Sequence, residues 1–366
     1  MDTMMLVWLT GALAALLVVA LVVVSIARAM EKGHPALKTN LPGPLARALG
    51  VNTDAPQSDA ETDDEKKKKQ AKTVYGVLAA VAALVGVVSF AENFNDGDIM
   101  PAISELTAGE LHGTLVNVRN SDPVVLIVPG SGPTDRDGNN PMGMKTDAYK
   151  MLAHELAERD IASVRIDKRG MFGSAAAGDA NAVAPAAYVA DIHSWIDAVK
   201  AERGSDCVWL LGHSEGALMV SLAAEGRKDV CGLILVAGMG RKMGDVIRDQ
   251  LRANPANAPV LEEALSALSE LEAGRHIDTA VMTPALLPLF ASPAQDYLTA
   301  MLTIDPVEAV RRAGKPTLVI QGTRDIQISA EDAKLLNKAP KTTLRFINDM
   351  NHILKEAPAD RAANIA

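Results

Sequence analysis

Cysteine and aromatic residues are scarce in this chain of 366 residues, which holds two cysteines and 3% Phe, Trp and Tyr. Cys207 and Cys231 form no CxxC or Cys/His pattern, so they exclude a disulfide scaffold and the usual structural zinc site. A surplus of basic residues is also missing, because the formal charge is −9 at pH 7. The broad positive surface that attracts DNA or RNA is therefore lacking, and we expect no nucleic-acid partner.

Long apolar runs are confined to the first 90 residues. Residues 4–27 and 73–90 carry no charged side chain, and as helices they would extend roughly 36 Å and roughly 27 Å. A signal peptide fits the first run poorly, because Asp2 precedes it without Lys or Arg and the run is too long. We therefore predict two transmembrane helices, the first within the segment 1–30. Buried core helices are the alternative.

The segment 31–72 between the two runs is polar and rich in Pro, Asp and Lys, which argues against a packed domain. Basic residues are concentrated between the two runs, whereas the charged residues just before the first run and just after the second run are all acidic. By the positive-inside rule the linker 31–72 is cytoplasmic and the chain after residue 90 is extracytoplasmic. The sequence thus predicts a multi-pass membrane protein. The basic residues on the cytoplasmic side are Arg28, Lys32, Lys38, Arg47, Lys66, Lys67, Lys68, Lys69 and Lys72.

After a connector at 91–110, short β-branched runs alternate with amphipathic stretches throughout the domain 111–366. This alternation favours a mostly parallel sheet flanked by helices, and continuous apolar strands indicate that both sheet faces are buried. Residues 240–312 interrupt the alternation with Leu- and Met-rich helical sequence, which predicts a helical cap. Predicted strands cover 111–118, 124–128, 162–166, 208–211, 232–236, 317–320 and 343–347, and predicted helices cover 147–158, 185–201, 215–225 and 330–337.

The strongest chemical signal is Gly212-His213-Ser214-Glu215-Gly216, which lies between an apolar strand and a helical stretch. This is the G-x-S-x-G pattern, in which a strained turn lifts the serine hydroxyl off the sheet and glycines let the backbone turn tightly. The helix that follows directs its first N–H groups toward the negative charge that develops during acyl transfer. We therefore predict that Ser214 is a nucleophile.

A nucleophilic serine needs a base and an orienting carboxylate, in the chain order Ser, Asp or Glu, His. Of the seven histidines, only His352 follows a late predicted strand in a loop of turn-forming residues. Asp325 comes just after the carboxyl end of the strand 317–320, where the acid of such a triad belongs. Asp349, three residues before His352, is the competing acid. The predicted triad is Ser214, Asp325 and His352.

A glycine-rich loop after the strand 124–128 can supply backbone N–H donors for the oxyanion. It begins Pro129-Gly130-Ser131-Gly132, and its glycines allow a backbone N–H to approach a substrate oxygen closely. We predict Ser131 N–H as an oxyanion donor, with Gly132 as second choice and Glu215 N–H as the partner from the elbow. A plain turn is the alternative. The phosphate-loop pattern G-x-x-x-x-G-K-[S/T] is not matched.

Together these motifs resemble bacterial α/β-hydrolase fold serine esterases, related to the acyl-CoA thioester hydrolase and serine-aminopeptidase-like branches. The resemblance covers about residues 111–357 and leaves the N-terminal membrane segments out. It implies the α/β-hydrolase fold with a helical cap, and it implies that Asp167 and Arg169 brace the loops around the pocket. With the two predicted membrane helices, it indicates a protein of the bacterial inner membrane. The motifs are the loop 129–139, Arg-Ile-Asp-Lys-Arg-Gly at 165–170, the elbow 212–216, Gly-Thr-Arg-Asp at 322–325 and Asn351-His352.

The predicted reaction is hydrolysis of a small-molecule carboxylic ester through an acyl-enzyme, with no metal or organic cofactor required. A thioesterase or a serine peptidase with the same triad is the alternative within enzymes. An inactive hydrolase-fold binding or scaffold protein is an alternative of another class, and the intact Ser, Asp and His set speaks against it.

Cys207 and Cys231 each lie at the start of a predicted strand, and in the resembled fold these two strands are parallel neighbours. Strands about 4.8 Å apart can bring the two Cα atoms within disulfide range. An extracytoplasmic compartment would preserve the bond. Two buried free thiols are the alternative, since a one-residue offset would point the side chains to opposite faces. The chain stops at Ala366, where the resembled fold usually continues into a final helix, so we expect a shortened C-terminal end.

Overall fold

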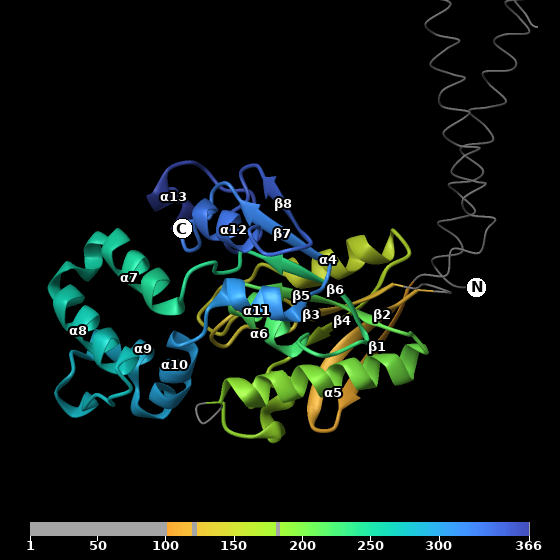
Figure 1. Cartoon of the computed structure of the whole chain (residues 1–366), viewed down its shortest axis with the longest axis horizontal. Coiled ribbons are helices and arrows are strands. Elements are labelled where there is room, and N and C mark those ends of the chain that lie inside the picture. The colour runs from red at the N-terminus through yellow and green to blue at the C-terminus, as the bar shows by residue number, and fades with distance from the viewer. Residues whose placement is uncertain (1–100, 119–122, 181–183, 366) are drawn as a thin grey trace, which may run out of the picture. The chain divides into compact units, whose positions relative to one another are not determined.

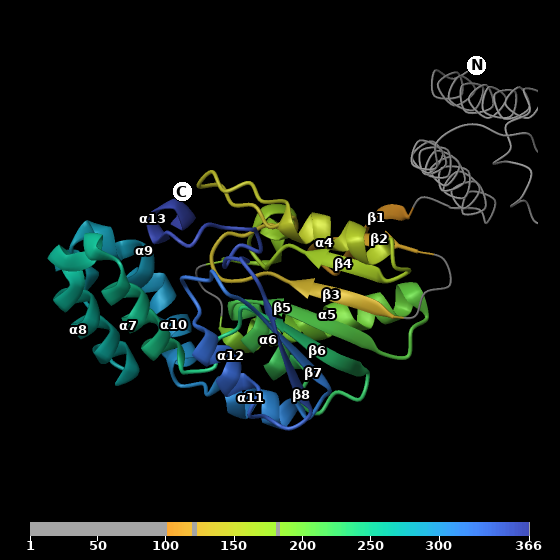
Figure 2. The same cartoon turned by 90° about the horizontal axis from the view of Figure 1, so that it is seen from above.

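The computed structural model describes residues 101–118, 123–180 and 184–365. The two predicted transmembrane helices and the linker 31–72 lie outside the described residues. Within the described ranges, no helix is both long enough and apolar enough to cross a membrane. These ranges fold around one sheet, with helices on both of its faces (Figures 1 and 2).

The sheet has eight strands in the order β1-β2-β4-β3-β5-β6-β7-β8. From β4 to β8 all neighbours are parallel, whereas β1 pairs antiparallel with β2 and β2 antiparallel with β4. The predicted mostly parallel sheet is therefore present. The strands are β1 (Ala102–Ala108), β2 (Leu111–Asn117), β3 (Val124–Val128), β4 (Ala162–Ile166), β5 (Val208–His213), β6 (Val230–Val236), β7 (Thr317–Gly322) and β8 (Thr342–Ile347).

The sequence prediction missed strand β1, which lies in the segment interpreted as the connector 91–110. β1 is an edge strand, and most of its side chains are exposed. An exposed edge strand needs no alternating apolar pattern, because neither of its faces is buried in a core. The sheet therefore begins nine residues before the predicted domain boundary at residue 111.

Helices cover the two faces of the sheet unequally. On one face, α4 packs against Val125, Ile127 and Leu211. On the other, α5 and α6 pack against the sheet and each other, and α11 packs against α6 (Figure 2). Alternate residues of β3 thus enter two different cores, as strand geometry requires. The helices are α4 (Ala148–Ala157), α5 (Pro185–Arg203), α6 (Glu215–Ala223), α11 (Pro306–Ala313), α12 (Ala330–Leu336) and α13 (Arg361–Ile365).

A helical cap lies between β6 and β7 in the chain, as predicted (Figures 1 and 2). In space its helices lie beyond one end of the sheet. Its interior is apolar, with Leu268, Phe290 and Met301 fully buried. The predicted range 240–312 is too long at its C-terminal end, because α11 leaves the cap and packs against α6. The cap helices are α7 (Met243–Ala253), α8 (Leu261–Glu272), α9 (Leu287–Phe290) and α10 (Gln295–Leu302).

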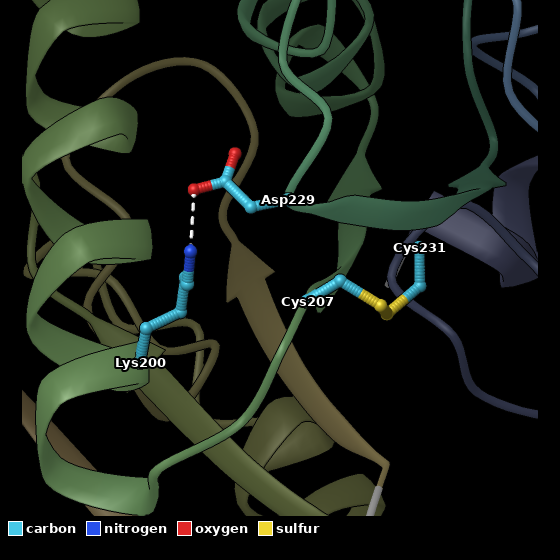
Figure 3. Close-up of a disulfide and its surroundings, with 4 residues drawn as sticks. All are labelled: Lys200, Cys207, Asp229 and Cys231. Atoms are coloured by element: carbon cyan, nitrogen blue, oxygen red, sulfur yellow. Dashed lines mark hydrogen bonds and ion pairs between the residues drawn. A yellow bond between two sulfur atoms is a disulfide. The ribbon is translucent and has the colours of Figure 1, made fainter.

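A disulfide joins Cys207 and Cys231 at the amino ends of β5 and β6, with 5.3 Å between their Cα atoms (Figure 3). The register shifts here, because Val208 pairs with Val230 and the next residue of β5 pairs with Gly232. Cys231 is therefore the extra residue of a β-bulge, which re-aims its side chain toward Cys207. The expected one-residue offset between the two strands therefore does not prevent the bond.

Candidate active site

Ser214 occupies the sharp turn between β5 and α6. Its backbone has φ 54° and ψ −119°, a strained conformation for a residue with a side chain, and its N–H donates to the Val236 carbonyl over 2.9 Å. The turn needs glycine on both sides. A Cβ on Gly212 would lie 2.2 Å from the Gly216 oxygen, and one on Gly216 would lie 2.6 Å from the Pro129 oxygen. Two glycines and a strained serine thus form the predicted elbow.

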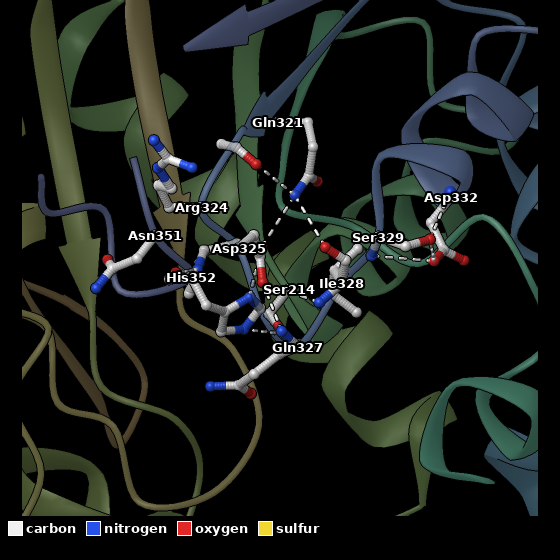
Figure 4. A network of polar contacts seen from close by, with 12 residues as sticks. Ser214, Gln321, Arg324, Asp325, Gln327, Ile328, Ser329, Asp332, Asn351 and His352 are labelled. Atoms are coloured by element: carbon white, nitrogen blue, oxygen red, sulfur yellow. Dashed lines mark hydrogen bonds and ion pairs between the residues drawn. The ribbon is translucent and has the colours of Figure 1, made fainter. Parts of the chain in front are cut away.

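The structure brings Ser214, His352 and Asp325 together at the carboxyl edge of the sheet (Figure 4). His352 Nε2 lies 3.1 Å from Ser214 Oγ, and His352 Nδ1 lies 2.9 Å from Asp325 Oδ2. The three side chains come from the loops after β5, β7 and β8. With a proton on Nδ1 held by the carboxylate, Nε2 is left to accept the proton of the serine hydroxyl.

The Asp325 carboxylate is buried and well supplied with donors. Gln327 N–H and Ile328 N–H donate to Oδ1 over 2.8 and 2.9 Å, and Gln321 Nε2 donates to Oδ2 over 3.0 Å (Figure 4). Burial alone would raise the pKa of Asp325, but the hydrogen bonds from His352 and these N–H groups hold that pKa below its usual value. Asp325 is therefore ionised and accepts from the imidazole at neutral pH.

The competing acid, Asp349, is engaged elsewhere. Its carboxylate accepts a hydrogen bond from Arg324 Nε over 3.0 Å, and its N–H donates to Thr323 Oγ1. Half of its side chain is exposed. Asp349 therefore supports the turn before His352, while Asp325 orients the imidazole.

His213 is a member of the site that the sequence analysis left without a role. It is buried, its Nε2 lies 2.8 Å from the His352 carbonyl oxygen, and its Nδ1 lies 2.7 Å from the Tyr149 hydroxyl. Burial, with the positive charge that His352 can carry, lowers the pKa of His213 to about 3, so its imidazole is neutral. Its position inside the elbow pattern was a usable signal, because a buried histidine needs hydrogen-bond partners.

The predicted oxyanion donors lie on both sides of Ser214. Glu215 is the first residue of α6, where a backbone N–H has no partner within the helix. The glycine-rich loop also lies against Ser214, because a Cβ on Gly130 would lie 3.1 Å from Ser214 Cβ. Ser131 lines the cavity beside Ser214, whereas Gly132 is not among the described residues that line it.

Asp167 and Arg169 lie where the resemblance implied, in contact with the loops around the site. Asp167 is buried and accepts from Arg136 N–H and Nε over 2.9 and 2.8 Å, which ties the glycine-rich loop to the end of β4. Arg169 pairs with Asp191 of α5 and donates to the Ala177 carbonyl. Both residues act on loop positions and lie away from the reacting atoms.

Ser214 and His352 line a solvent-accessible cavity of about 200 Å³. Its wall includes the hydroxyl and amide side chains of Ser131, Thr134, Asn140, Thr146 and Gln327. The leucine- and methionine-rich cap helices do not contribute to the described wall, because their apolar side chains fill the cap's own core. No group of three or more His, Cys, Asp or Glu residues in the described ranges could hold a metal ion.

Two sequence comparisons show what this chain is similar to. A family model described as serine aminopeptidase, S33, matches residues 141–283. Esterase EstD of Thermotoga maritima is 26% identical over 274 residues, which cover 72% of this chain and 61% of that esterase. The chain thus matches less than two thirds of that relative's length.

Solved structures with a similar chain trace include two esterases. Est1E from Butyrivibrio proteoclasticus is 17% identical, with a TM-score of 0.44, over 69% of this chain and 91% of that chain. The Pyrococcus furiosus esterase Pf2001 is 15% identical, with a TM-score of 0.45, over 70% of this chain and 86% of that chain. The strand order, the elbow and the matched sequences show that this chain has the α/β-hydrolase fold and is similar to serine esterases of that fold.

Proposed function

We propose that this protein is a serine hydrolase that cleaves a small, uncharged carboxylic ester. The observation that carries the proposal is the hydrogen-bonded series Ser214, His352 and Asp325 at the edge of an open cavity. A nucleophile, a base and an orienting carboxylate in contact are what acyl transfer needs. A scaffold protein that had lost activity would have no reason to keep all three at hydrogen-bond distance.

The reaction proceeds in two halves. Ser214 Oγ attacks the ester carbonyl carbon as its proton passes to His352 Nε2, and backbone N–H groups hold the resulting oxyanion. The bond to the alcohol oxygen then breaks, and the alcohol leaves with the proton from His352. A water molecule then attacks the carbonyl carbon of the acyl-enzyme and gives a proton to His352. The bond to Ser214 Oγ breaks as His352 returns that proton to Oγ, and the carboxylic acid is released.

The cavity wall favours an ester over the two enzymatic alternatives. The described residues that line it include no Lys, Arg, Asp or Glu. An acyl-CoA thioester carries phosphates that basic side chains usually bind, and the free amino terminus of a peptide calls for a carboxylate. A wall of hydroxyl, amide and apolar side chains, the last including Met144, Ile353 and Leu354, suits an uncharged ester.

Membrane anchoring belongs to the same proposal. The uncharged runs 4–27 and 73–90 would hold the protein in the bacterial inner membrane, with the hydrolase domain on the extracytoplasmic side. The disulfide between Cys207 and Cys231 supports this orientation, because such bonds persist in oxidising compartments and are rare in the cytosol.

Replacement of the nucleophile tests the activity. Ser214→Ala should abolish hydrolysis of p-nitrophenyl acetate and butyrate, because no other serine in the described ranges is held against His352. Ser221→Ala is the matched control, since Ser221 lies in the same helix α6 and donates only to the Ala217 carbonyl. It should keep near wild-type activity. Substantial activity in folded Ser214→Ala protein, or faster turnover of acyl-CoA or aminoacyl substrates than of esters, would contradict the proposal.

A further inference from the structure

A buried lysine contacts the glycine-rich loop from the side opposite to the triad. Lys168 follows β4, and its Nζ donates to the Gly130 carbonyl over 2.5 Å. Gly130 follows the neighbouring parallel strand β3, so both residues reach the same edge of the sheet. Lys168 is only 7% exposed. A lysine is almost never buried to this extent without a specific partner, so its contact with Gly130 calls for an explanation.

Lys168 and Ser131 line two different cavities. Lys168 lines the smaller one together with Pro129 and Glu215, whereas Ser131 lines the cavity that contains Ser214. In a trans peptide the carbonyl and the following N–H point in opposite directions. Because Lys168 holds the Gly130 carbonyl on one side, the Ser131 N–H is directed to the other side, where Ser214 lies.

A second buried side chain lies beside the same loop. The Gly130 backbone opposes the rise that burial causes in the pKa of Tyr149, and the Tyr149 hydroxyl lies 2.7 Å from His213 Nδ1. Gly130 therefore lies between two buried side chains, Lys168 and Tyr149. Glu215 lies close enough to favour the charged form of Lys168, which opposes the lowering of the pKa of Lys168 by burial.

We propose that Lys168 is a positioning residue for the oxyanion hole, which holds the Gly130 carbonyl away from Ser214 and so aims the Ser131 N–H at the substrate's carbonyl oxygen. Lys168 touches neither the substrate nor the triad in this scheme. The inference rests on the proposed function, because an oxyanion forms only if Ser214 attacks an acyl group. It adds a residue outside the triad on which turnover depends.

The test compares an ester with its thionoester, in which sulfur replaces the carbonyl oxygen. Sulfur accepts hydrogen bonds from N–H groups weakly, so an aimed oxyanion donor accelerates the ester far more than the thionoester. Lys168→Met removes the ammonium but keeps the length of the side chain. We expect it to lower kcat for the ester by about 10- to 100-fold, with KM changed less than about threefold. The ratio of ester to thionoester kcat/KM should fall at least about tenfold, because the thionoester has little of this stabilisation to lose.

Three comparisons make the result specific. Lys200→Met removes another partly buried lysine, which pairs with Asp229 over 2.9 Å near the disulfide (Figure 3), and it should leave both kcat and the ratio unchanged. Asp325→Asn should slow the ester and the thionoester alike and leave their ratio intact. Lys168→Gln, whose amide nitrogen ends one atom short of Nζ, serves as a second variant if Lys168→Met does not fold, and it should give the same fall in the ratio.

The outcomes separate this inference from the proposed function. If Ser214→Ala retains esterase activity, the proposed function itself fails. If Ser214→Ala is inactive while a folded Lys168 variant keeps wild-type kcat, the positioning role alone is wrong. A fall in kcat with an unchanged ester-to-thionoester ratio would also overturn it, because Lys168 would then act on the fold in general.

Discussion

His213 Nε2 donates a hydrogen bond to the backbone carbonyl of His352, with 2.8 Å between the two atoms. A carbonyl oxygen only accepts, so Nε2 carries the proton, and Nδ1 accepts from the Tyr149 hydroxyl. The residue before the nucleophile thus holds the loop of the general base, 139 positions further along the chain. The neutral imidazole of His213 therefore links the nucleophile Ser214, which follows it in the chain, to the loop that carries the general base His352.

The neutral state of His213 predicts a pH dependence of stability. An unfolded histidine titrates near pH 6.5, whereas the pKa of folded His213 is lowered to about 3, so between these values the unfolded chain binds the extra proton. The free energy of unfolding should therefore rise with pH across this window, by up to about 1.4 kcal/mol per pH unit from this residue, with no contribution above it. Urea unfolding at several pH values measures the slope.

His213→Gln should flatten that slope below about pH 6.5, whereas His276→Gln, at an exposed histidine of the cap, should leave it as in the wild type. Equal slopes in the wild type and in His213→Gln would show that His213 is not buried in its neutral form.

The acid of the triad can be distinguished from its neighbour by two matched variants. Asp325→Asn should lower kcat by about 10⁴-fold, because the amide favours the wrong imidazole tautomer, and it should cost less than Ser214→Ala. Asp349→Asn should change kcat by less than about threefold, since its carboxylate pairs with Arg324 and does not reach the imidazole. Steady-state kinetics on p-nitrophenyl butyrate decides between them, and the reverse order of effects would move the acid role to Asp349.

The disulfide predicts a redox-dependent stability. The two cysteines are 24 positions apart, and a cross-link across a loop of this length stabilises a fold by about 3 kcal/mol in the chain-entropy model. The double variant Cys207→Ala/Cys231→Ala should lose about this much in urea unfolding while keeping its activity, because the bond lies at the end of the sheet away from the triad. Thiol titration of the denatured, unreduced protein should find no free thiol, and two free thiols per chain would rule the bond out.

The membrane orientation has its own measurement. A cysteine introduced at Gln57, in the predicted cytoplasmic linker, should react with a membrane-impermeant maleimide only after the cells are permeabilised. A cysteine introduced at Glu225, in the hydrolase domain, should react when only the outer membrane is permeabilised and the inner membrane is intact. Labelling of the Gln57 position in intact cells would place the hydrolase domain in the cytoplasm.

Local sequence patterns predicted the parts of the site that depend on local geometry. The elbow around Ser214 is a strand, a turn and a helix in immediate succession, and the loops of Asp325 and His352 directly follow apolar strands. Chain order and strand ends were therefore enough to bring the three residues together. The glycine requirement at Gly212 is equally local, because a Cβ there would meet the Gly216 backbone within the turn. The requirement at Gly216 is not local, since a Cβ there would meet the Pro129 carbonyl of the glycine-rich loop.

Contacts between distant segments could not be predicted in this way. Tyr149 meets His213 across 64 positions, and Lys168 meets Gly130 across 38. Neither pair has a spacing that distinguishes it from unrelated residues, and only the strand order makes them neighbours. The bulge at Cys231 and the exposed strand β1 could not be predicted either. Neither an irregular register nor an exposed edge strand gives a clear alternation of apolar residues.

Asp332 in the first turn of α12 carries a consequence for how far the cap can be altered. Its buried carboxylate accepts from the N–H groups of Gly240 and Arg241 and from the Arg241 guanidinium, over 2.9 to 3.2 Å. The cap therefore starts from a rigid joint on the helix that follows the Asp325 loop. At its other end the cap gives way to α11, which packs against α6. Between these two ends the cap also contacts the Asp325 loop, because Gln250 of α7 donates to the Gln327 carbonyl over 3.0 Å. A chimaera that receives another cap should therefore keep its proton-transfer geometry only if the new cap preserves this contact.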